Sequence, residues 1–291
     1  MYDTILLPTD GKSGTEQALE RALDLARTFD ASLHTLSVVE TGPAPTQLPE
    51  DEQQTLHDHL EDRGEATTLD VQNRADSFGL DVVRQIREGR PYRAIPEYVS
   101  EHDIDLVVMG TRGRVESDLH HLGSTTQRVL TRVDVPVLTV ALDETVTVPT
   151  AGYDMYNRVV IPTDGSDAPE RAAESALTIA ERYGADVRVI YVVDTETYGL
   201  EDAPRSIVGL LKEGGKNAVE TVATGATDRN LPVSTAILRG APEEAILQYA
   251  HGTQADLIAM GTRGRGGDER LLGSTTARVV RRSGIPVLTV R

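Results

Sequence analysis

Four short motifs occur twice in this 291-residue chain, in the same order in each half. The first half carries Pro8-Thr9-Asp10-Gly11, Gly110-Thr111-Arg112-Gly113, Gly123-Ser124-Thr125-Thr126 and Pro136-Val137-Leu138-Thr139-Val140. The second half repeats these residue types from Pro162, Gly261, Gly273 and Pro286. Four matched motifs in the same order indicate a tandem duplication. Each copy is long enough to bury a core of its own.

Short apolar segments alternate with helical ones in both copies. In the first copy we expect strands at 4–7, 33–39, 82–86, 106–109 and 136–140, separated by helices at 13–29, 50–77, 91–102 and from 123 onward. The second copy follows the same order from 158 to 290. Strands separated by helices predict right-handed crossovers. The predicted fold class is therefore α/β: two tandem domains, each an open five-stranded parallel sheet with helices on both faces.

The segment between the copies lacks apolar periodicity and contains Pro149 and Gly152. Such a stretch is typical of a linker. We therefore expect a first domain at 1–141, a linker at 142–156 and a second domain at 157–291.

The chain is acidic, with a formal net charge of −17. This charge disfavours broad binding to nucleic acid, which requires clustered cations against the phosphates. Only three of the 29 basic residues are lysines, at positions 12, 212 and 216. An acidic chain with so little lysine is typical of halophilic proteins, whose self-repulsion is screened by salt. An ordinary acidic mesophilic protein is the alternative.

No apolar run approaches the roughly 20 residues of a membrane helix. The first residues lack the basic segment followed by an apolar one that marks a secretory signal. The chain has no cysteine, which excludes disulfides and thiolate metal sites. These features predict a cytoplasmic protein without a membrane partner.

The second motif opens a glycine-rich loop after the fourth expected strand, Gly110-x2-Gly113-x9-Gly123-Ser124. Glycine at the end of a strand lets the backbone turn sharply and approach a ligand closely. The helix that follows offers unpaired N–H groups and its positive dipole end to a phosphate. Ser124 and Thr125 add hydroxyl donors, and Arg112 adds a cation. Tight turns and a helix cap are the alternative, but repetition of the loop in the same context favours phosphate binding.

Pro8-Thr9-Asp10-Gly11 follows the first expected strand. Because ligands of open α/β sheets bind outside the carboxyl ends of the strands, Asp10 lies beside the same site as the glycine loop. Its carboxylate, like that of Asp164, can accept hydrogen bonds from an adenine amino group or a ribose hydroxyl. A helix N-cap or a turn is an equal alternative, since Asp and Gly are frequent in both.

Taken together, the strand with Pro-Thr-Asp-Gly, the Gly-x2-Gly-x9-Gly-Ser loop and Pro-Val-Leu-Thr-Val resemble the universal stress protein family, once per half. The resemblance implies Rossmann-like domains of the adenine nucleotide alpha hydrolase-like type. In the ATP-binding branch, the glycine loop holds ribose and phosphates, and the valine closing the second strand lines the adenine pocket. The first candidate nucleotide site is then Pro8, Thr9, Asp10, Val38, Met109, Gly110, Arg112, Gly113, Gly123, Ser124 and Thr125. The second is Pro162, Thr163, Asp164, Val192, Met260, Gly261, Arg263, Gly264, Gly273, Ser274 and Thr275.

The second glycine loop departs from this pattern. Eight residues separate Gly264 from Gly273, whereas nine separate Gly113 from Gly123. A deletion of one residue can shift the phosphate donors. The sequence therefore leaves open whether the second site works.

Several catalytic patterns are missing from the sequence. No Gly-x4-Gly-Lys-Ser/Thr motif occurs, and no Ser-His-Asp or nucleophile-elbow context is visible. His57 and His59 lie in an acidic helical stretch and lack zinc-type spacing with a partner. We therefore expect no catalytic residue, exposed histidines and no metal held by protein side chains.

These observations predict a stress-response or regulatory protein that binds ATP, or ADP or AMP, with Mg²⁺ on the phosphates. A slow ATP hydrolase and a nucleotide-independent scaffold with vestigial sites are the alternatives. Family members pair through the edge of their last strand. The resemblance therefore implies an internal pseudo-dimer of 136–140 with 286–290, and a homodimer is also open.

Overall fold

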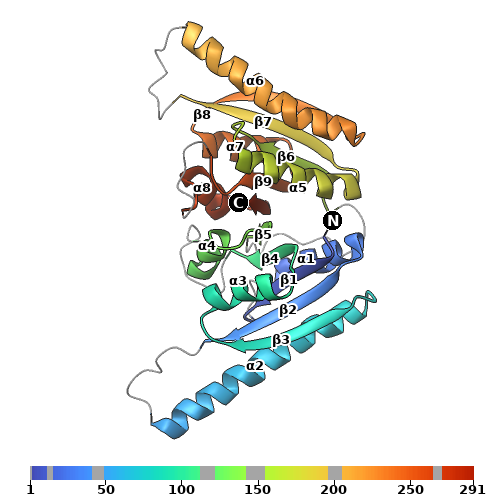
Figure 1. Cartoon of the computed structure of the whole chain (residues 1–291), viewed down its shortest axis with the longest axis vertical. Coiled ribbons are helices and arrows are strands. Elements are labelled where there is room, and N and C mark those ends of the chain that lie inside the picture. The colour runs from blue at the N-terminus through green and yellow to red at the C-terminus, as the bar shows by residue number, and fades with distance from the viewer. Residues whose placement is uncertain are drawn as a thin grey trace. The chain divides into compact units, whose positions relative to one another are not determined.

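Strands and helices alternate through both halves of the computed structural model (Figure 1). The structure describes residues 2–11, 16–40, 49–111, 122–141, 155–195, 205–264 and 271–291. The chain divides into two units, Met1–Gly152 and Tyr153–Arg291. Both units have the same order of elements, so the repeat in the sequence is a repeat of structure.

The first unit is a parallel sheet in the order β3-β2-β1-β4-β5. Its strands are β1 (Thr4–Thr9), β2 (Ser32–Val39), β3 (Val82–Glu88), β4 (Leu106–Gly110) and β5 (Val137–Val140). Its helices are α1 (Glu16–Phe29), α2 (Glu50–Asp76), α3 (Pro91–Glu101) and α4 (Ser124–Leu130).

The second unit has the matching order β8-β7-β6-β9-β10, also parallel. Its strands are β6 (Arg158–Pro162), β7 (Asp186–Asp194), β8 (Val233–Gly240), β9 (Leu257–Gly261) and β10 (Val287–Val290). Its helices are α5 (Asp167–Tyr183), α6 (Arg205–Asp228), α7 (Pro242–Gly252) and α8 (Ser274–Arg282).

Helices cover both faces of each sheet. The expected apolar face of α1 is buried from Ala18 to Phe29. Arg74 of α2 forms ion pairs with Glu16 and Glu20 of α1, so these two helices share one face. Helix α3 packs against α4 on the other face, and α7 packs against α8 in the same way. The layered α/β class predicted from the sequence is confirmed.

The site-bearing edge follows from the strand order. Strand β1 lies between β2 and β4, so the chain reverses its direction of winding there. The turns after β1 and β4 therefore lead to helices on opposite faces, and the strand ends between them form the topological switch point. Strands β6 and β9 occupy the same positions in the second unit.

Element boundaries lie close to the predicted ones. Helix α2 was expected at 50–77 and spans Glu50–Asp76, and Pro91 is the first residue of α3 as expected. The expected start of α1 at 13 and most of the predicted linker lie outside the described residues. Met155 and Tyr156 are buried, and the Tyr156 ring lies 5.1 Å from that of Tyr183. The domain limits inferred from the sequence stay a prediction.

Among the described residues, none of the helices combines the length and apolar character that crossing a membrane requires.

Candidate functional site

The turn after the first strand has the same construction in both halves. Gly11 has a φ of 69° and Gly165 a φ of 74°, in the left-handed region that favours glycine. The Gly11 N–H donates to Thr9 Oγ1 at 3.2 Å, and the Gly165 N–H donates to Thr163 Oγ1 at 3.1 Å. The Pro-Thr-Asp-Gly motif therefore encodes a tight turn. This turn brings the aspartate to the carboxyl end of the strand.

Asp164 meets the glycine loop at this edge. Its Oδ1 accepts hydrogen bonds from the Ser166 N–H at 3.0 Å and the Ser166 hydroxyl at 2.5 Å, at the start of α5. Its Oδ2 lies so near Gly264 that a Cβ there would be 2.4 Å away. The carboxylate thus has the turn role that the sequence allowed, and it also contacts the loop. Two motifs far apart in the sequence, at 162–165 and 261–264, thus come together in one place.

The base of each glycine loop is closed by two hydrogen bonds. The Gly273 N–H donates to the Thr262 carbonyl at 2.8 Å, and Thr276 Oγ1 donates to the Gly261 carbonyl at 2.8 Å. In the first half, Gly123 N–H bonds the Thr111 carbonyl at 2.9 Å, and Thr126 Oγ1 bonds the Gly110 carbonyl at 3.0 Å. The shorter second loop therefore has the same base as the first.

Thr126 and Thr276 were not predicted as site residues. They end the repeated Gly-Ser-Thr-Thr motif, and that repetition is the signal that could have pointed to them. Both side chains are buried, at 3% exposure, and each ties the start of a helix to the end of a strand. We assign them the positioning of the loop.

Gly261 is required by close packing. A Cβ at this position would lie 2.7 Å from the backbone nitrogen of Pro169 and 2.8 Å from the carbonyl carbon of Ala168. The end of β9 therefore approaches the first turn of α5 more closely than any side chain allows. This contact holds the glycine loop against the Asp164 turn.

The next residue, Thr262, is 4% exposed, and its hydroxyl has no hydrogen-bond partner among the described residues. An unpaired buried hydroxyl is costly, so it marks a place where a ligand or a water can bond. Helix α8 begins after Gly273, and within the described part of the chain this N-cap residue forms no side-chain cap. Ser274 is exposed and Thr275 half-buried, so donors at this helix start are open to solvent. Together these donors suit an anion.

The other predicted residues divide into four groups. Arg112 and Gly113 lie outside the described residues. Met109 and Met260 are buried at the ends of β4 and β9. Half-buried positions are held by Pro8, Val38, Gly123, Thr125, Val192, Gly273 and Arg263, while Pro162 is buried and Ser124 and Asp10 are exposed.

Helix α2 closes over the Asp10 turn in the first half. Arg63 donates to the Asp10 carbonyl at 3.2 Å, and a Cβ on Gly11 would meet Thr67 Oγ1 at 2.3 Å. Neither α2 residue was predicted, because the contact depends on the path of the helix across the sheet. The first site is thus framed by an additional cation.

The start of helix α3, which follows β3, differs in charge from the start of α7, which follows β8. The Arg128 guanidinium lies 4.2 Å from the centre of the Tyr92 ring, and the hydrogen bond from Arg90 lowers the pKa of Tyr92. In the second half, Arg278 forms an ion pair with Glu243 at 2.6 Å. Within the described residues, the contact of α3 with α4 is therefore more cationic than that of α7 with α8.

The strand order and the paired turns define a tandem, doubly wound α/β protein with one candidate ligand site per half. The family model described as "Universal stress protein family" matches residues 1–141 and 155–291. The chain belongs to the universal stress protein family. The resemblance drawn from the motifs is confirmed.

Relatives match single halves and the whole chain. A universal stress protein of Methanocaldococcus jannaschii is 42% identical over 144 residues, covering 48% of this chain and 85% of that protein. One from Mycolicibacterium smegmatis is 26% identical over 302 residues and covers 99% of this chain and 96% of its own. A solved universal stress protein from Archaeoglobus fulgidus has a TM-score of 0.74 at 24% identity, covering 99% of this chain and 96% of that one. The tandem organisation is thus shared with full-length relatives.

Proposed function

We propose that this chain is a stress-response or regulatory protein that binds an adenine nucleotide, ATP with Mg²⁺, at the switch point of each half. The observation that carries the proposal is the contact between Asp164 and Gly264, near the start of α8 with its glycine N-cap. It combines an acceptor for a ribose or adenine group with donors for a phosphate. The buried hydroxyl of Thr262 adds a further unsatisfied group at the same edge.

Each group has a distinct part in the proposed site. The Asp164 carboxylate accepts from the nucleoside, while Ser274, Thr275 and the first-turn N–H groups of α8 donate to phosphate oxygens. Arg263 supplies a positive charge in the loop. Mg²⁺ neutralises the remaining phosphate charge, held by the phosphates themselves. The first site uses Asp10, Gly110, Gly123, Ser124 and Thr125 in the same roles.

We assign the protein a binding role, with the nucleotide setting its state. The sequence contains no P-loop lysine motif and no Ser-His-Asp or nucleophile-elbow pattern, which favours binding over rapid turnover. Slow ATP hydrolysis is the second candidate; steady phosphate release abolished by Asp10→Ala would favour it. A scaffold with vestigial sites is the third.

We also propose that the two halves pair through β5 and β10, and that the pairing can extend to a homodimer. Each of these strands is the last in the sheet of its own unit, bonded there to β4 or β9 on one side. An edge strand presents a second row of N–H and C=O groups that a partner strand can use.

Titration calorimetry with Mg-ATP in molar KCl tests nucleotide binding. We expect heat with a stoichiometry of two per chain, and tighter binding than for cyclic AMP or a guanine nucleotide. A stoichiometry of one would assign binding to one half alone. No heat would overturn the proposal and favour the scaffold.

Gly264→Ala separates the second site from the first. The added Cβ would lie 2.4 Å from Asp164 Oδ2, so the carboxylate must move away. We expect the stoichiometry to fall from two to one. Gly252→Ala is the matched control, because a Cβ there meets nothing within 4 Å. An unchanged stoichiometry in Gly264→Ala would remove this contact from the site.

A further inference from the structure

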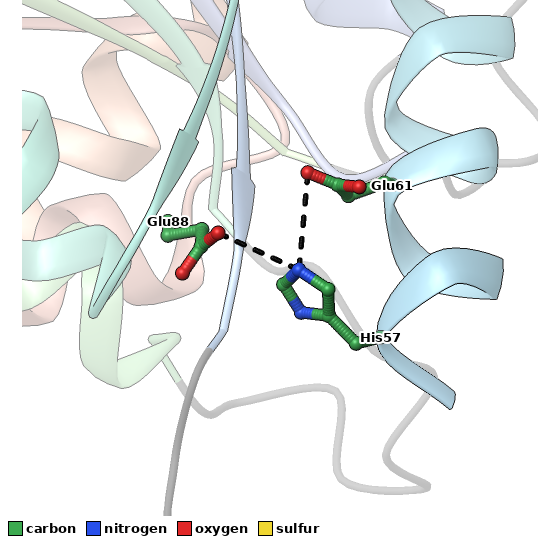
Figure 2. A group of neighbouring side chains, drawn as sticks. All are labelled: His57, Glu61 and Glu88. Atoms are coloured by element: carbon green, nitrogen blue, oxygen red, sulfur yellow. Dashed lines mark ion pairs between the residues drawn. The ribbon is translucent and has the colours of Figure 1, made fainter. Parts of the chain in front are cut away.

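A histidine and two glutamates converge at the carboxyl end of β3 (Figure 2). His57 and Glu61 lie one turn apart on α2, and Glu88 is the last residue of β3. His57 Nε2 lies 3.8 Å from Glu61 Oε1 and 3.4 Å from Glu88 Oε1. Their ligand atoms all lie within 4.8 Å of one another, the one such trio in the described residues. Three side chains from two elements thus point to a common position.

The spacing of these atoms fits a tetrahedral metal ion. Zn²⁺ binds histidine nitrogen and carboxylate oxygen at about 2.0–2.2 Å, which places neighbouring ligand atoms of a tetrahedron about 3.4 Å apart. The two distances from His57 Nε2 are 3.4 and 3.8 Å. The two glutamate oxygens lie within 4.8 Å of each other, so an ion can be bound if these flexible carboxylates close toward it. Imidazole favours first-row transition metals, whereas Mg²⁺ and Ca²⁺ prefer oxygen ligands alone.

We propose that His57, Glu61 and Glu88 form a binding site for a divalent transition-metal ion of the Zn²⁺ type. A water molecule completes the fourth position, because three protein ligands leave it open. The ion links the first part of α2 to the end of β3. It is separate from the Mg²⁺ of a bound nucleotide, which is held by phosphates.

The trio lies between the sheet and solvent. Helix α2 is anchored on the sheet by the buried residues Thr68 and Val71. His57 is 27% exposed, whereas Glu61 and Glu88 are 48% and 58% exposed. The histidine thus forms the inner wall of the site, and the carboxylates form its solvent side. The ligand atoms are therefore open to an ion from solvent.

The sequence predicts an exposed histidine here, because Glu88 is distant along the chain and comes from another element. The fold supplies that ligand. The second half lacks one of these ligands. Arg239, before Gly240, occupies the position that Glu88 has before Gly89 in the first half. We therefore expect one ion per chain. The competing explanation is a pair of ordinary histidine–glutamate ion pairs that hold no metal.

The test is calorimetric titration of the full chain with Zn²⁺, without nucleotide and with excess Mg²⁺. The Mg²⁺ occupies weak sites among the 46 acidic residues. We expect one strong Zn²⁺ site in the wild type. His57→Asn and Glu88→Gln should each weaken it about 10- to 100-fold or more, the effect of disturbing the ligand shell of a metal site.

His59→Asn and Glu52→Gln are the matched controls, because both residues are exposed on α2 and lie outside the trio. Both should bind Zn²⁺ like the wild type. Zn²⁺ should also raise the melting temperature of the wild type and His59→Asn, and not that of His57→Asn. Circular dichroism checks that each variant is folded.

Equal Zn²⁺ affinity in the wild type and His57→Asn, or no site above the Mg²⁺ background, would overturn the proposal in favour of ion pairs alone. Neither result bears on nucleotide binding, which is measured separately with ATP.

Discussion

His34 lies inside the first half on β2, where its charge is disfavoured. Its Nδ1 is 2.9 Å from the Tyr98 hydroxyl, and its ring lies 5.7 Å from that of His102. Burial lowers the pKa of His34, and the neighbouring His102 lowers it further. Arg87 lies over the Tyr98 ring and bonds Glu101, so a cation and a carboxylate also face this cluster. A proton on His34 therefore meets more opposition in the folded state than in the unfolded one.

This imbalance makes the stability of the first half depend on pH. Below about pH 6.5 the unfolded chain protonates His34 while the folded chain resists, so the unfolded state binds more protons. The stabilisation from keeping His34 neutral is fully present above the pKa of this histidine in the unfolded chain. It is lost as the pH falls from that value toward the lowered pKa in the folded chain. We expect the melting temperature to fall more between pH 7.5 and pH 5 in the wild type than in a variant that lacks this histidine.

His34→Gln should reduce this decline, and thermal melts at matched pH values measure it. The fold does not require histidine at this position, because the equivalent residue in the second copy is Arg188 on β7. Other groups titrate in the same range, so the difference between the two proteins is what counts. Identical slopes for both would remove His34 as a source.

The site residues show what a sequence can and cannot predict. The meeting of Asp164 with Gly264 is predictable in principle, because both follow parallel strands whose carboxyl ends share an edge. The Thr276 bond to Gly261 is not, since it depends on how a helix starts. The neighbourhood of His57 and Glu88 depends on the path of α2 across the sheet, which no local pattern specifies.

At the scale of elements, the long helix of each half crosses its sheet at a glycine. A Cβ on Gly64 of α2 would lie 3.0 Å from Ser37 Oγ of β2, and one on Gly215 of α6 would lie 2.5 Å from the Tyr191 ring of β7. Gly64 and Gly215 therefore permit the close approach of helix and strand in both halves. The sequence predicts these helices from their pattern, but not the reason for a glycine in their middle.

Adjacent glycines on α6 allow a sharp comparison. Gly215→Ala would put a Cβ within 3.0 Å of three ring carbons of Tyr191. Overpacking of this kind costs about 1–3 kcal/mol, offset by about 1 kcal/mol of helix propensity, so we expect a net loss of up to about 2 kcal/mol. Gly214→Ala meets nothing within 4 Å and should gain up to about 1 kcal/mol. Urea unfolding of both variants measures the difference; a stabilised Gly215→Ala would show that Tyr191 moves aside at little cost.

The strands and helices are predicted well because their burial follows their periodicity. Ile5, Leu6 and Leu7 are fully buried in β1, as expected for a strand covered on both faces. The extra residues of β1, up to Thr9, continue into the motif itself, where Pro8 and Thr9 keep parallel register with β2. A prediction based on apolar residues therefore ends this strand too early, because its last residues belong to the polar motif.

At the scale of the whole molecule, the two copies share one architecture and differ in charge. The first half has Arg63 on the Asp10 turn, and arginines around Tyr92. The second half pairs Arg278 with Glu243 and Arg282 with Glu244. The two copies thus differ in charged side chains while keeping the same sheet order. If the proposed nucleotide sites exist, these differences in charge are expected to give them different affinities for phosphate.

The net charge of the chain bears on its stability as a whole. With 46 acidic and 29 basic residues, the folded state concentrates negative charge and repels itself. Raising the salt from 0.1 M to 1 M shortens the Debye length from about 10 Å to about 3 Å. The same screening weakens exposed ion pairs such as that of Lys216 with Glu213, which are worth at most about 1 kcal/mol each.

Because the excess charge outweighs such pairs, we expect the melting temperature to rise by several degrees between low and molar KCl. The pH supplies the control. The sequence pI is about 4.8, so near pH 5 the net charge is small and the KCl effect should shrink. A rise that persists near pH 5 would point to general exclusion of salt from the protein surface. A melting temperature that stays level at pH 7.5 would favour an ordinary acidic protein over one adapted to a high-salt interior.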